Sequence, residues 1–314
     1  MFYVATLISS PDRPAVTDAL AQKVARYLPH GRPVDWLAPG VATDIAFLVE
    51  EFEGAETAEA EAAEAEALFK DMAQDIRDMI GGDPVDVVIQ PHEGRRKTLF
   101  LADMDSTMIG QECIDELADY AGFKDRVAAI TERAMRGEIA FEPALRERVA
   151  LLKGLPSTAI DKVIAERIRL TPGGRTLVAT MRAHGAYTCL VSGGFTAFTS
   201  KIAAMIGFDE NHANTLLADA GGKLTGEVAD PVLGREAKLA TLNALRTRFG
   251  LARDATLAAG DGANDIPMLA AAGLGVAFHA KPAVKEAAAA RIEHGDLTAL
   301  LYAQGYRREE FVGE

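Results

Sequence analysis

The chain of 314 residues is poor in cysteine and has no run of about 18 consecutive apolar residues. We therefore expect no membrane-spanning helix. The two cysteines, Cys113 and Cys189, are too few for a disulfide framework, and both lie in apolar-patterned segments. We expect them to be reduced and buried in a cytoplasmic protein. The first ten residues, MFYVATLISS, lack the basic segment of a secretory signal peptide and predict a strand.

Positive charge is also scarce, with 33 Lys and Arg against 46 Asp and Glu, a net charge of −13. This balance argues against nucleic acid as the main partner. Residues 50–66 hold eight Glu and no Lys or Arg, so the rest of the chain carries only −5. This Ala/Glu-rich stretch predicts a solvated helix surface. The apolar fraction of 49% and charged fraction of 25% exclude a disordered or fibrous chain, and the length allows two domains.

Residues 1–90 predict the order strand, helix, strand, strand, helix, strand. Apolar residues recur every four positions between Val16 and Leu28, and a second apolar face runs from Leu68 to Ile80, where Gly81 and Gly82 follow. The strands are expected over residues 2–8, 34–37, 45–49 and 85–89. This order is typical of a small α+β, ferredoxin-like domain. The polar residues 91–97 form a plausible boundary.

The remainder, residues 98–314, predicts an α/β domain with a doubly wound parallel sheet. Short apolar runs alternate with helical patterns, which is typical of parallel strands covered on both faces. The runs are residues 99–102, 187–191, 256–259 and 274–278. About residues 110–170 have a helical pattern too long for one crossover, and we interpret them as an inserted helical cap. Residues 216–228, with Gly221-Gly222 as the turn, predict a hairpin. No internal repeats were found.

Polar residues follow three of the predicted strands. The first strand ends in Asp103, the second in Ser192-Gly193-Gly194, and the third in Gly260-Asp261-Gly262, before Asn264-Asp265. Ligands of open α/β sheets bind outside the carboxyl ends of the strands. We therefore expect these carboxylates, the hydroxyl and the glycines to meet at one edge of the sheet.

Three aspartates dominate this edge. Asp103 and Asp105 are two positions apart, a spacing that a strand places on one face. Paired carboxylates suit a nucleophile with an acid–base partner, or metal ligation. Asp261 would add a third acid, and three carboxylates repel one another unless a cation intervenes, which implies Mg²⁺. The alternative is that each aspartate only caps the helix that follows it.

Two motifs, DMDST at residues 103–107 and GDGANDIPML at residues 260–269, resemble those of the haloacid dehalogenase-like phosphatase superfamily. Ser192-Gly193-Gly194-Phe195 and Lys238 match its other two motif positions, and the resemblance spans about residues 98–290. Within the superfamily the chain is most similar to the phosphoserine phosphatases. That similarity rests on Glu112 with residues 113–115, on residues 134–137, and on Phe141 and Arg148. Met104 stands where Phe is common, and both side chains are apolar.

The resemblance implies Mg²⁺-dependent hydrolysis of O-phosphoserine through an aspartyl-phosphate, the last step of serine biosynthesis. Asp103 would attack phosphorus, and Asp105 would protonate the leaving serine oxygen and then take a proton from water. Mg²⁺ would bind the Asp103 carboxylate, the Asp105 backbone carbonyl and Asp261. The phosphoryl oxygens would bind Ser192, the Gly193 N–H and Lys238. Asn264 would contact the phosphate or a water, and Asp265 would orient Lys238 or the metal's surroundings.

Arg148 is the main candidate for substrate recognition in the cap. In a helix opening at Pro143 it shares a stripe with Leu145 and Leu152, so its guanidinium is expected to point inward. Burying an unpaired cation costs free energy, and an ion pair with the substrate carboxylate would offset that cost. The alternative is a buried partner such as Glu112 or Glu138.

The resemblance assigns three further cap residues to the substrate. Glu112 would bind the substrate ammonium, whereas alone it would be an acid favoured by a helix start. Met135 and Phe141 would pack on the substrate, and without the resemblance both would be interpreted as core residues.

The first 90 residues resemble an ACT domain, which suggests serine as an effector and a homodimer. The alternative is a stability or assembly module that binds no ligand. Two rival functions also stay open. One is a phosphatase or phosphotransferase of the same superfamily acting on another small phosphate ester, such as phosphohomoserine, a phosphosugar or a nucleotide. The other is a non-enzymatic amino-acid sensor, against which the complete set of acids, Ser and Lys argues.

Overall fold

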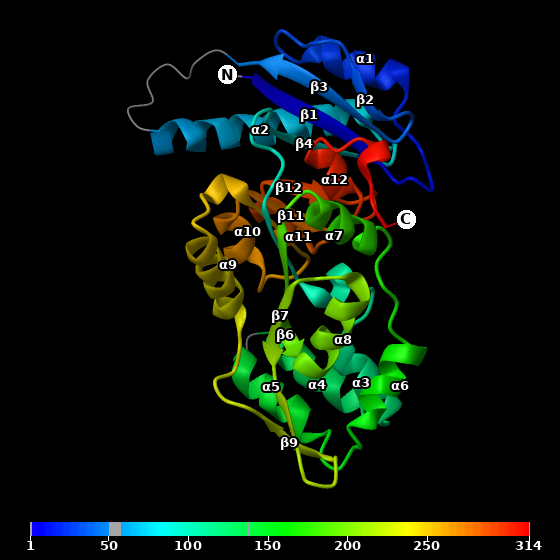
Figure 1. Cartoon of the computed structure of the whole chain (residues 1–314), viewed down its shortest axis with the longest axis vertical. Helices are drawn as coiled ribbons and strands as arrows, with labels where there is room; N and C mark the ends of the chain where they lie inside the picture. The colour runs from blue at the N-terminus through cyan, green and yellow to red at the C-terminus, as the bar shows by residue number, and fades with distance from the viewer. Residues whose placement is uncertain (1, 50–57, 137, 314) are drawn as a thin grey trace.

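The computed structural model describes residues 2–49, 58–136 and 138–313. Figure 1 shows three parts along the long axis of the molecule. An N-terminal unit lies at one end, a parallel sheet with its helices occupies the middle, and a group of short helices with a hairpin lies at the far end. The predicted α/β fold with an inserted helical cap is confirmed.

The N-terminal unit is a four-stranded antiparallel sheet in the order β2-β3-β1-β4. Its elements are β1 (Phe2–Ser9), α1 (Asp18–Tyr27), β2 (Asp35–Ala38), β3 (Ala42–Leu48), α2 (Ala58–Ile80) and β4 (Val85–Pro91). β3 begins three residues before the predicted strand, because Thr43 and Asp44 interrupt the apolar pattern yet are buried. Asp44 is satisfied there by the Thr6 hydroxyl at 2.7 Å and by Arg95.

The helices α1 and α2 share one apolar core with one face of this sheet. Val24 of α1 and Ile76 of α2 are buried against Leu7 and Phe47. α2 begins ten residues before the predicted apolar face. The predicted solvated glutamate surface falls mostly outside the described residues; of its eight glutamates only Glu64 has a described side chain, and that side chain is exposed.

The central sheet has six parallel strands in the order β12-β11-β10-β5-β6-β7. Its strands are β5 (Leu99–Ala102), β6 (Tyr187–Phe195), β7 (Glu210–Asn214), β10 (Thr256–Gly260), β11 (Leu274–Phe278) and β12 (Ala290–Ile292). All four predicted strands are present. β7 and β12 were missed, because ENHAN is polar and ARI is too short to show a pattern.

Helices cover both faces of this sheet. α7 (Gly174–Ala183), α8 (Thr196–Ile206) and α12 (Ala299–Ala303) lie on one face, and α9 (Arg235–Phe249), α10 (Ile266–Ala271) and α11 (Pro282–Ala287) on the other. Successive residues of β5 alternate between the two cores, with Phe100 on one side and Leu101 on the other. Cys113 and Cys189 are free and buried, as predicted.

The cap inserted between β5 and β6 contains α3 (Cys113–Tyr120), α4 (Lys124–Met135), α5 (Phe141–Ala150) and α6 (Thr158–Glu166). The predicted hairpin is β8 (Leu216–Ala218) with β9 (Leu224–Val228), and it joins the cap through backbone hydrogen bonds from Gly154 to Leu224 and from Leu224 to Leu155. Among the described residues, no helix combines the length and the apolar character needed to span a bilayer.

Candidate active site

The carboxyl edge of the central sheet gathers the predicted acids. Asp103 directly follows β5, and Asp261 directly follows β10, its neighbour in the sheet. Carboxylate oxygens of Asp103, Asp261 and Asp265 all lie within 4.8 Å of one another, and all three side chains are buried. The parallel register of β5 and β10 causes this meeting, since parallel strands end at the same edge.

Asp105 lies at the same edge but faces another way. The sequence predicts that Asp103 and Asp105 share one face of a strand. β5 instead ends at Ala102, and both residues stand in the sharp turn that follows it. The Asp103 side chain accepts a hydrogen bond from the Met104 N–H at 2.8 Å. The Asp105 carboxylate accepts one from the Cys113 N–H at 2.9 Å and lies 3.4 Å from the Ser192 hydroxyl. It therefore faces the cap and the Ser192 loop, and is not part of the three-carboxylate cluster.

Lys238 of α9 is the cation of the cluster. Its Nζ lies 2.7 Å from Asp103 Oδ1 and 2.6 Å from Asp265 Oδ1, and only 2% of its side chain is exposed. Burial alone would lower the pKa of Lys238, but the charges of Asp103 and Asp265 raise the pKa above its ordinary value. The ammonium therefore stays charged, with donor capacity left over for a third acceptor.

Asp265 fixes the position of this lysine. Its second oxygen accepts a hydrogen bond from the Gly262 N–H at 3.0 Å, so both ends of the carboxylate are held. A Cβ added at Gly260 would lie 2.4 Å from the Asp265 Cγ, which means that this close approach requires glycine. Asn264 is half-buried in the same loop, beside Gly262.

Burial also perturbs the acids. It raises the pKa of Asp103 well above the ordinary value, although Lys238 opposes the shift. It raises the pKa of Asp105 to about 6, with Glu112 adding to the effect. It raises the pKa of Asp261 to about 6, with Asp265 adding to the effect. Clustered buried carboxylates favour protons or a cation, and a donor set of oxygens alone suits a hard divalent ion such as Mg²⁺.

The end of β6 provides a glycine-rich loop. The Ser192 hydroxyl accepts a hydrogen bond from the Gly194 N–H at 2.9 Å. A Cβ at Gly194 would lie 3.0 Å from both Asp105 Oδ2 and Ser192 Oγ, so a larger residue there would crowd the site. The aromatic ring of Phe141, from the first turn of the cap helix α5, packs 3.4 Å from the position of a Gly193 Cβ. This contact brings the cap over the loop.

Two residues that support the site were not recognised from the sequence. Asn214 of β7 donates to the backbone oxygens of Gly193, at 2.9 Å, and Leu233, at 3.1 Å, and accepts from the Leu233 N–H at 2.7 Å. It ties the glycine-rich loop to the segment before α9. Thr107 donates to Asp261 at 3.2 Å. The only sequence signal for Thr107 was its place in DMDST, and Asn214 had none.

Arg148 has no carboxylate partner within 4.0 Å among the residues that the structure describes. Its guanidinium makes long contacts only, at 3.3 Å to the Ala144 oxygen and 3.5 Å to the Thr131 hydroxyl. Burial lowers the pKa of Arg148, and the charges of Asp115 and Glu112 partly offset this effect. Glu138, the alternative partner for Arg148, forms an ion pair with Arg136 at 2.6 Å instead.

Glu112 precedes α3 and accepts a hydrogen bond from the Ser106 hydroxyl at 2.7 Å, so it stands at the boundary of the cap and the DMDST turn. Met135 is the last residue of α4. Its side chain, and Gly137 of the same motif, lie outside the described residues.

Comparisons with known proteins agree with this geometry. The sequence model of the haloacid dehalogenase-like hydrolases matches residues 100–270. A phosphoserine phosphatase of Streptomyces coelicolor is 40% identical over 309 residues, which cover 97% of this chain and 72% of that protein. The structure of a probable phosphoserine phosphatase from Vibrio cholerae, in unliganded form, matches with a TM-score of 0.72 and 30% identity, over 98% of this chain and 88% of that chain.

A substrate-bound phosphoserine phosphatase complex matches with a TM-score of 0.61 and 42% identity, over 66% of this chain and 97% of that chain. The family model covers more than half of the chain, and the Streptomyces relative covers nearly all of it. The chain therefore belongs to the haloacid dehalogenase-like hydrolase family.

Proposed function

We propose that this protein is a Mg²⁺-dependent phosphoserine phosphatase, which hydrolyses O-phospho-L-serine to L-serine and phosphate. The observation that carries the proposal is the contact of a buried Asp103 carboxylate with Lys238, beside the carboxylate of Asp261. The relatives named above support the choice of substrate, since the Streptomyces protein is 40% identical over 309 residues, nearly the whole of this chain.

In the first step the Asp103 carboxylate attacks phosphorus in line, and the bond from phosphorus to the serine oxygen breaks. Asp105 gives its proton to the departing oxygen. A pKa of about 6 makes a protonated Asp105 accessible near neutral pH. Ser192, the Gly193 N–H and Lys238 bind the phosphoryl oxygens, and Asn264 assists them at the rim.

In the second step water attacks the phosphorus of the aspartyl-phosphate, the bond from phosphorus to the Asp103 oxygen breaks, and phosphate is released. Asp105, now a carboxylate, accepts a proton from that water, so one residue serves as acid and then as base. Asp105 has the freedom to do this because its carboxylate stands outside the Asp103–Asp261–Asp265 cluster. Asp265 acts through Lys238, which it positions.

Mg²⁺ fits the donor set at the sheet edge. The Asp103 and Asp261 carboxylates and the Asp105 backbone carbonyl would hold it, and Thr107 would orient Asp261. When bound, a divalent ion neutralises the repulsion between the phosphate and the attacking carboxylate.

The cap supplies the recognition of the amino acid. Arg148 would clamp the substrate carboxylate, which fits a half-buried guanidinium with no carboxylate partner within 4.0 Å among the described residues. Glu112 would bind the ammonium, and Phe141 and Met135 would pack on the serine carbons. The Phe141 side chain is accessible for such a contact, since 41% of its surface is exposed and its ring lies beside Gly193.

The test is phosphate release from O-phosphoserine with Mg²⁺ and with EDTA. We expect turnover that requires the metal, and a preference for phosphoserine over phosphohomoserine, a phosphosugar and a nucleotide. If one of those esters were hydrolysed faster, the proposed substrate would be wrong. If the phosphoryl group were transferred to an added alcohol in place of water, the protein would be a phosphotransferase. Full turnover in EDTA would contradict the metal dependence.

We also propose that residues 1–90 form an ACT-like domain that binds serine and contributes to a homodimer. The βαββαβ order and the sheet order β2-β3-β1-β4 support this fold. Calorimetry of the full chain with serine and Mg²⁺, compared in the wild type and in Arg148→Ala, which lacks the proposed carboxylate clamp of the active site, tests for a serine site elsewhere. Serine binding that persists in Arg148→Ala supports the ACT-like site, and its loss would contradict that site. Two reduced, buried cysteines support a cytoplasmic location.

A further inference from the structure

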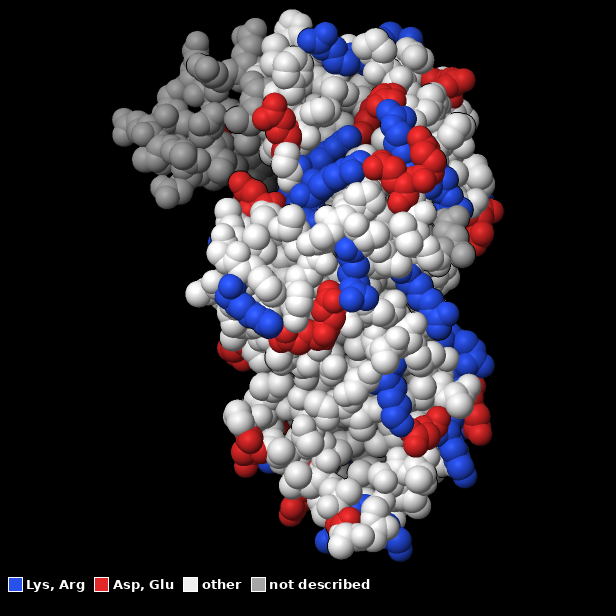
Figure 2. All heavy atoms as spheres, in the orientation of Figure 1, with Lys and Arg blue, Asp and Glu red and all other residues white. Residues whose placement is uncertain are grey.

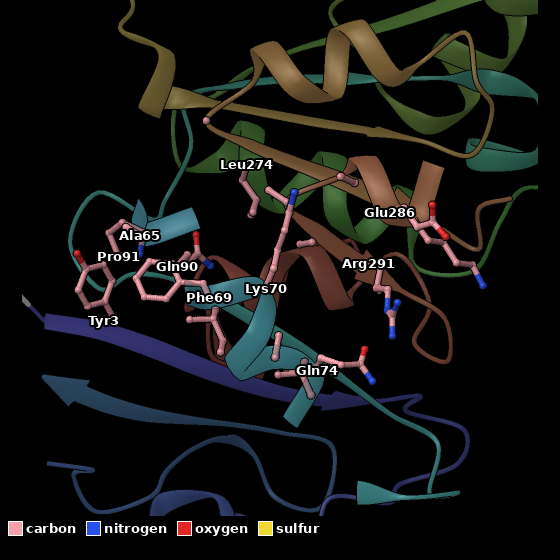
Figure 3. A pocket seen from close by; sticks show the side chains of 18 of the residues that line it. Tyr3, Ala65, Phe69, Lys70, Gln74, Gln90, Pro91, Leu274, Glu286 and Arg291 are labelled. Atoms are coloured by element: carbon pink, nitrogen blue, oxygen red, sulfur yellow. The ribbon is translucent and has the colours of Figure 1, made fainter. Parts of the chain in front are cut away.

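A cavity of 490 Å³ lies at the seam between the N-terminal unit and the central sheet (Figure 3). One wall is α2 with β1 and β4, and the opposite wall comes from α11, from the start of β11 and from β12. This volume is within the range of small-molecule sites. We call it the seam pocket.

The seam pocket is remote from the active site along the strands. Arg253 and Asp254 precede β10, and Leu274 begins β11, so the pocket opens at the amino ends of these strands. Asp261 follows the carboxyl end of β10. A molecule in the seam pocket therefore contacts none of the residues proposed for catalysis.

The pocket has an apolar end and a charged end. Tyr3, Phe69 and Pro91 lie together at one end in Figure 3, and the rings of Tyr3 and Phe69 are 4.5 Å apart. Arg291 and Glu286 lie toward the other end, with Lys70 and Gln74 between. Small aliphatic side chains complete the lining, including Ala65, Ala73, Val87 and Ala290.

Positive charge predominates in this lining, although the whole chain carries −13. Among the lining residues that the structure describes, five cationic side chains face two anionic ones: Lys70, Arg77, Arg253, Lys285 and Arg291 against Asp254 and Glu286. Figure 2 shows basic side chains, with acidic neighbours, at the junction beside α2. Glu293, behind the lining, pairs with Lys285 and with Arg291 and neutralises only part of the excess.

Two arginines, Arg77 and Arg291, bring positive charge together at the charged end of the pocket. The Nε of Arg291 is buried and makes no hydrogen bond, although an oxygen of Glu293 lies 3.0 Å away. Burial and the charge of Arg291 lower the pKa of Arg77 to about 10, although the charges of Glu293, Asp86 and Asp78 act in the opposite direction. Arg77 and Arg291 therefore repel each other in a partly desolvated space. An anion placed between them would relieve both costs.

We propose that the seam pocket is a second ligand site, which takes a small amphipathic anion with an aromatic or branched apolar body and one anionic group. The body would lie on Tyr3 and Phe69, and the anionic group would meet Arg77 and Arg291. Because the walls come from both units, such a ligand stabilises their docking and raises the midpoint of thermal unfolding.

The test titrates the full chain with anilinonaphthalene sulfonate, an aromatic anion whose fluorescence rises in apolar sites. Mg²⁺ and inorganic phosphate are present throughout, so that the active site is occupied. We expect one saturable site. Gln74→Glu adds an anion to the charged part of the pocket at an exposed position and should weaken binding about tenfold. Its control is Gln22→Glu, the same change at an exposed position of α1, which should leave the affinity unchanged.

A second pair makes the same comparison by removing a cation. Arg291→Gln should also weaken binding about tenfold, and the exposed Arg175→Gln should not. Turnover of O-phosphoserine and the unfolding midpoint of each variant show that the fold is intact. Equal affinity of all four variants and the wild type would overturn the proposal, and so would the absence of a saturable site in the wild type.

Discussion

Lys238 links the groups that define the site at the scale of single residues. It contacts the Asp103 oxygen on one side and Asp265 on the other, while Gly262 anchors Asp265. The proposed nucleophile and the proposed phosphate-binding cation are thus held together before any substrate arrives, which is the preorganisation that phosphoryl transfer needs.

Replacing Arg148 with Ala should lower kcat/KM for O-phosphoserine about a hundredfold, because a charge-assisted clamp on the carboxylate is lost. For O-phosphoethanolamine, which lacks the carboxylate, we expect a change of less than about threefold. Steady-state phosphate release measures both. Arg146→Ala, on the outer side of the same helix, is the matched control. Equal losses on both substrates would exclude the clamp.

The raised pKa of Asp261, about 6, makes both Mg²⁺ binding and stability depend on pH. Between about pH 4 and pH 6 the Asp261 carboxyl keeps its proton in the folded, metal-free protein. In the unfolded chain, where the pKa of an aspartate is about 3.9, it has released that proton. The stability of the metal-free protein should therefore fall as pH rises from about 4 to 6, and Mg²⁺ must displace that proton below pH 6. We expect Mg²⁺ to raise the unfolding midpoint more at about pH 7.5 than at about pH 5. The same rise at both values would contradict this linkage.

At the scale of elements, the site depends on a tight turn after β10. Gly260→Ala would place a Cβ 2.4 Å from the Asp265 Cγ, in a fully buried position. We expect a loss of about 1–3 kcal/mol in the free energy of unfolding, together with a fall in turnover because Asp265 no longer holds Lys238. Chemical denaturation measures the first and phosphate release the second.

The control for Gly260→Ala is Gly82→Ala, where an added Cβ meets no atom within 4 Å. That change should stay within about 0.5 kcal/mol. If the two variants were equally stable and active, the close packing of Asp265 on Gly260 would not matter.

Most elements of the central sheet could be predicted because buried parallel strands have continuous apolar sequences. β5 reads LFLA and β11 reads LGVAF, and both were found with their bounds. β7 reads ENHAN and could not be found, since its Glu210 and Asn214 are satisfied by partners distant in sequence. Those partners exist only once the chain has folded.

The same limit applies within the site. The predicted meeting of Asp103 and Asp261 needs only the parallel register of β5 and β10. The direction of the Asp105 side chain depends on the turn after β5, where Ser106 has a φ of 55° and Asp105 accepts from the cap. No periodicity of the sequence encodes that turn, so the strand-based prediction for the pair was wrong.

At the scale of the whole molecule, Asp86 of β4 connects the N-terminal unit to the central domain. Its buried carboxylate accepts hydrogen bonds from the backbone N–H groups of Glu293 at 2.7 Å, His294 at 3.1 Å and Gly295 at 2.8 Å, just beyond β12. Gln90 of the same strand donates to the Ala303 oxygen at 2.6 Å. The two units are thus joined by polar contacts at defined positions.

Asp86→Ala leaves three backbone N–H groups without their acceptor, that of Gly295 in a buried position. We expect a loss of about 2–4 kcal/mol in unfolding free energy and faster cleavage of residues 91–97 by a protease, because the units separate more often. Asp71→Ala, which removes an exposed acid of α2, is the control. Unchanged cleavage and stability would show that the seam does not depend on Asp86.

The central claim is that Asp103 is the nucleophile, and Asp103→Asn tests it most directly. The amide keeps the shape of the side chain but cannot attack phosphorus as an anion. With Mg²⁺ and O-phosphoserine, we predict that steady-state phosphate release falls by at least about a thousandfold while the unfolding midpoint shows a folded protein. Near-normal phosphate release from the folded variant would contradict the account.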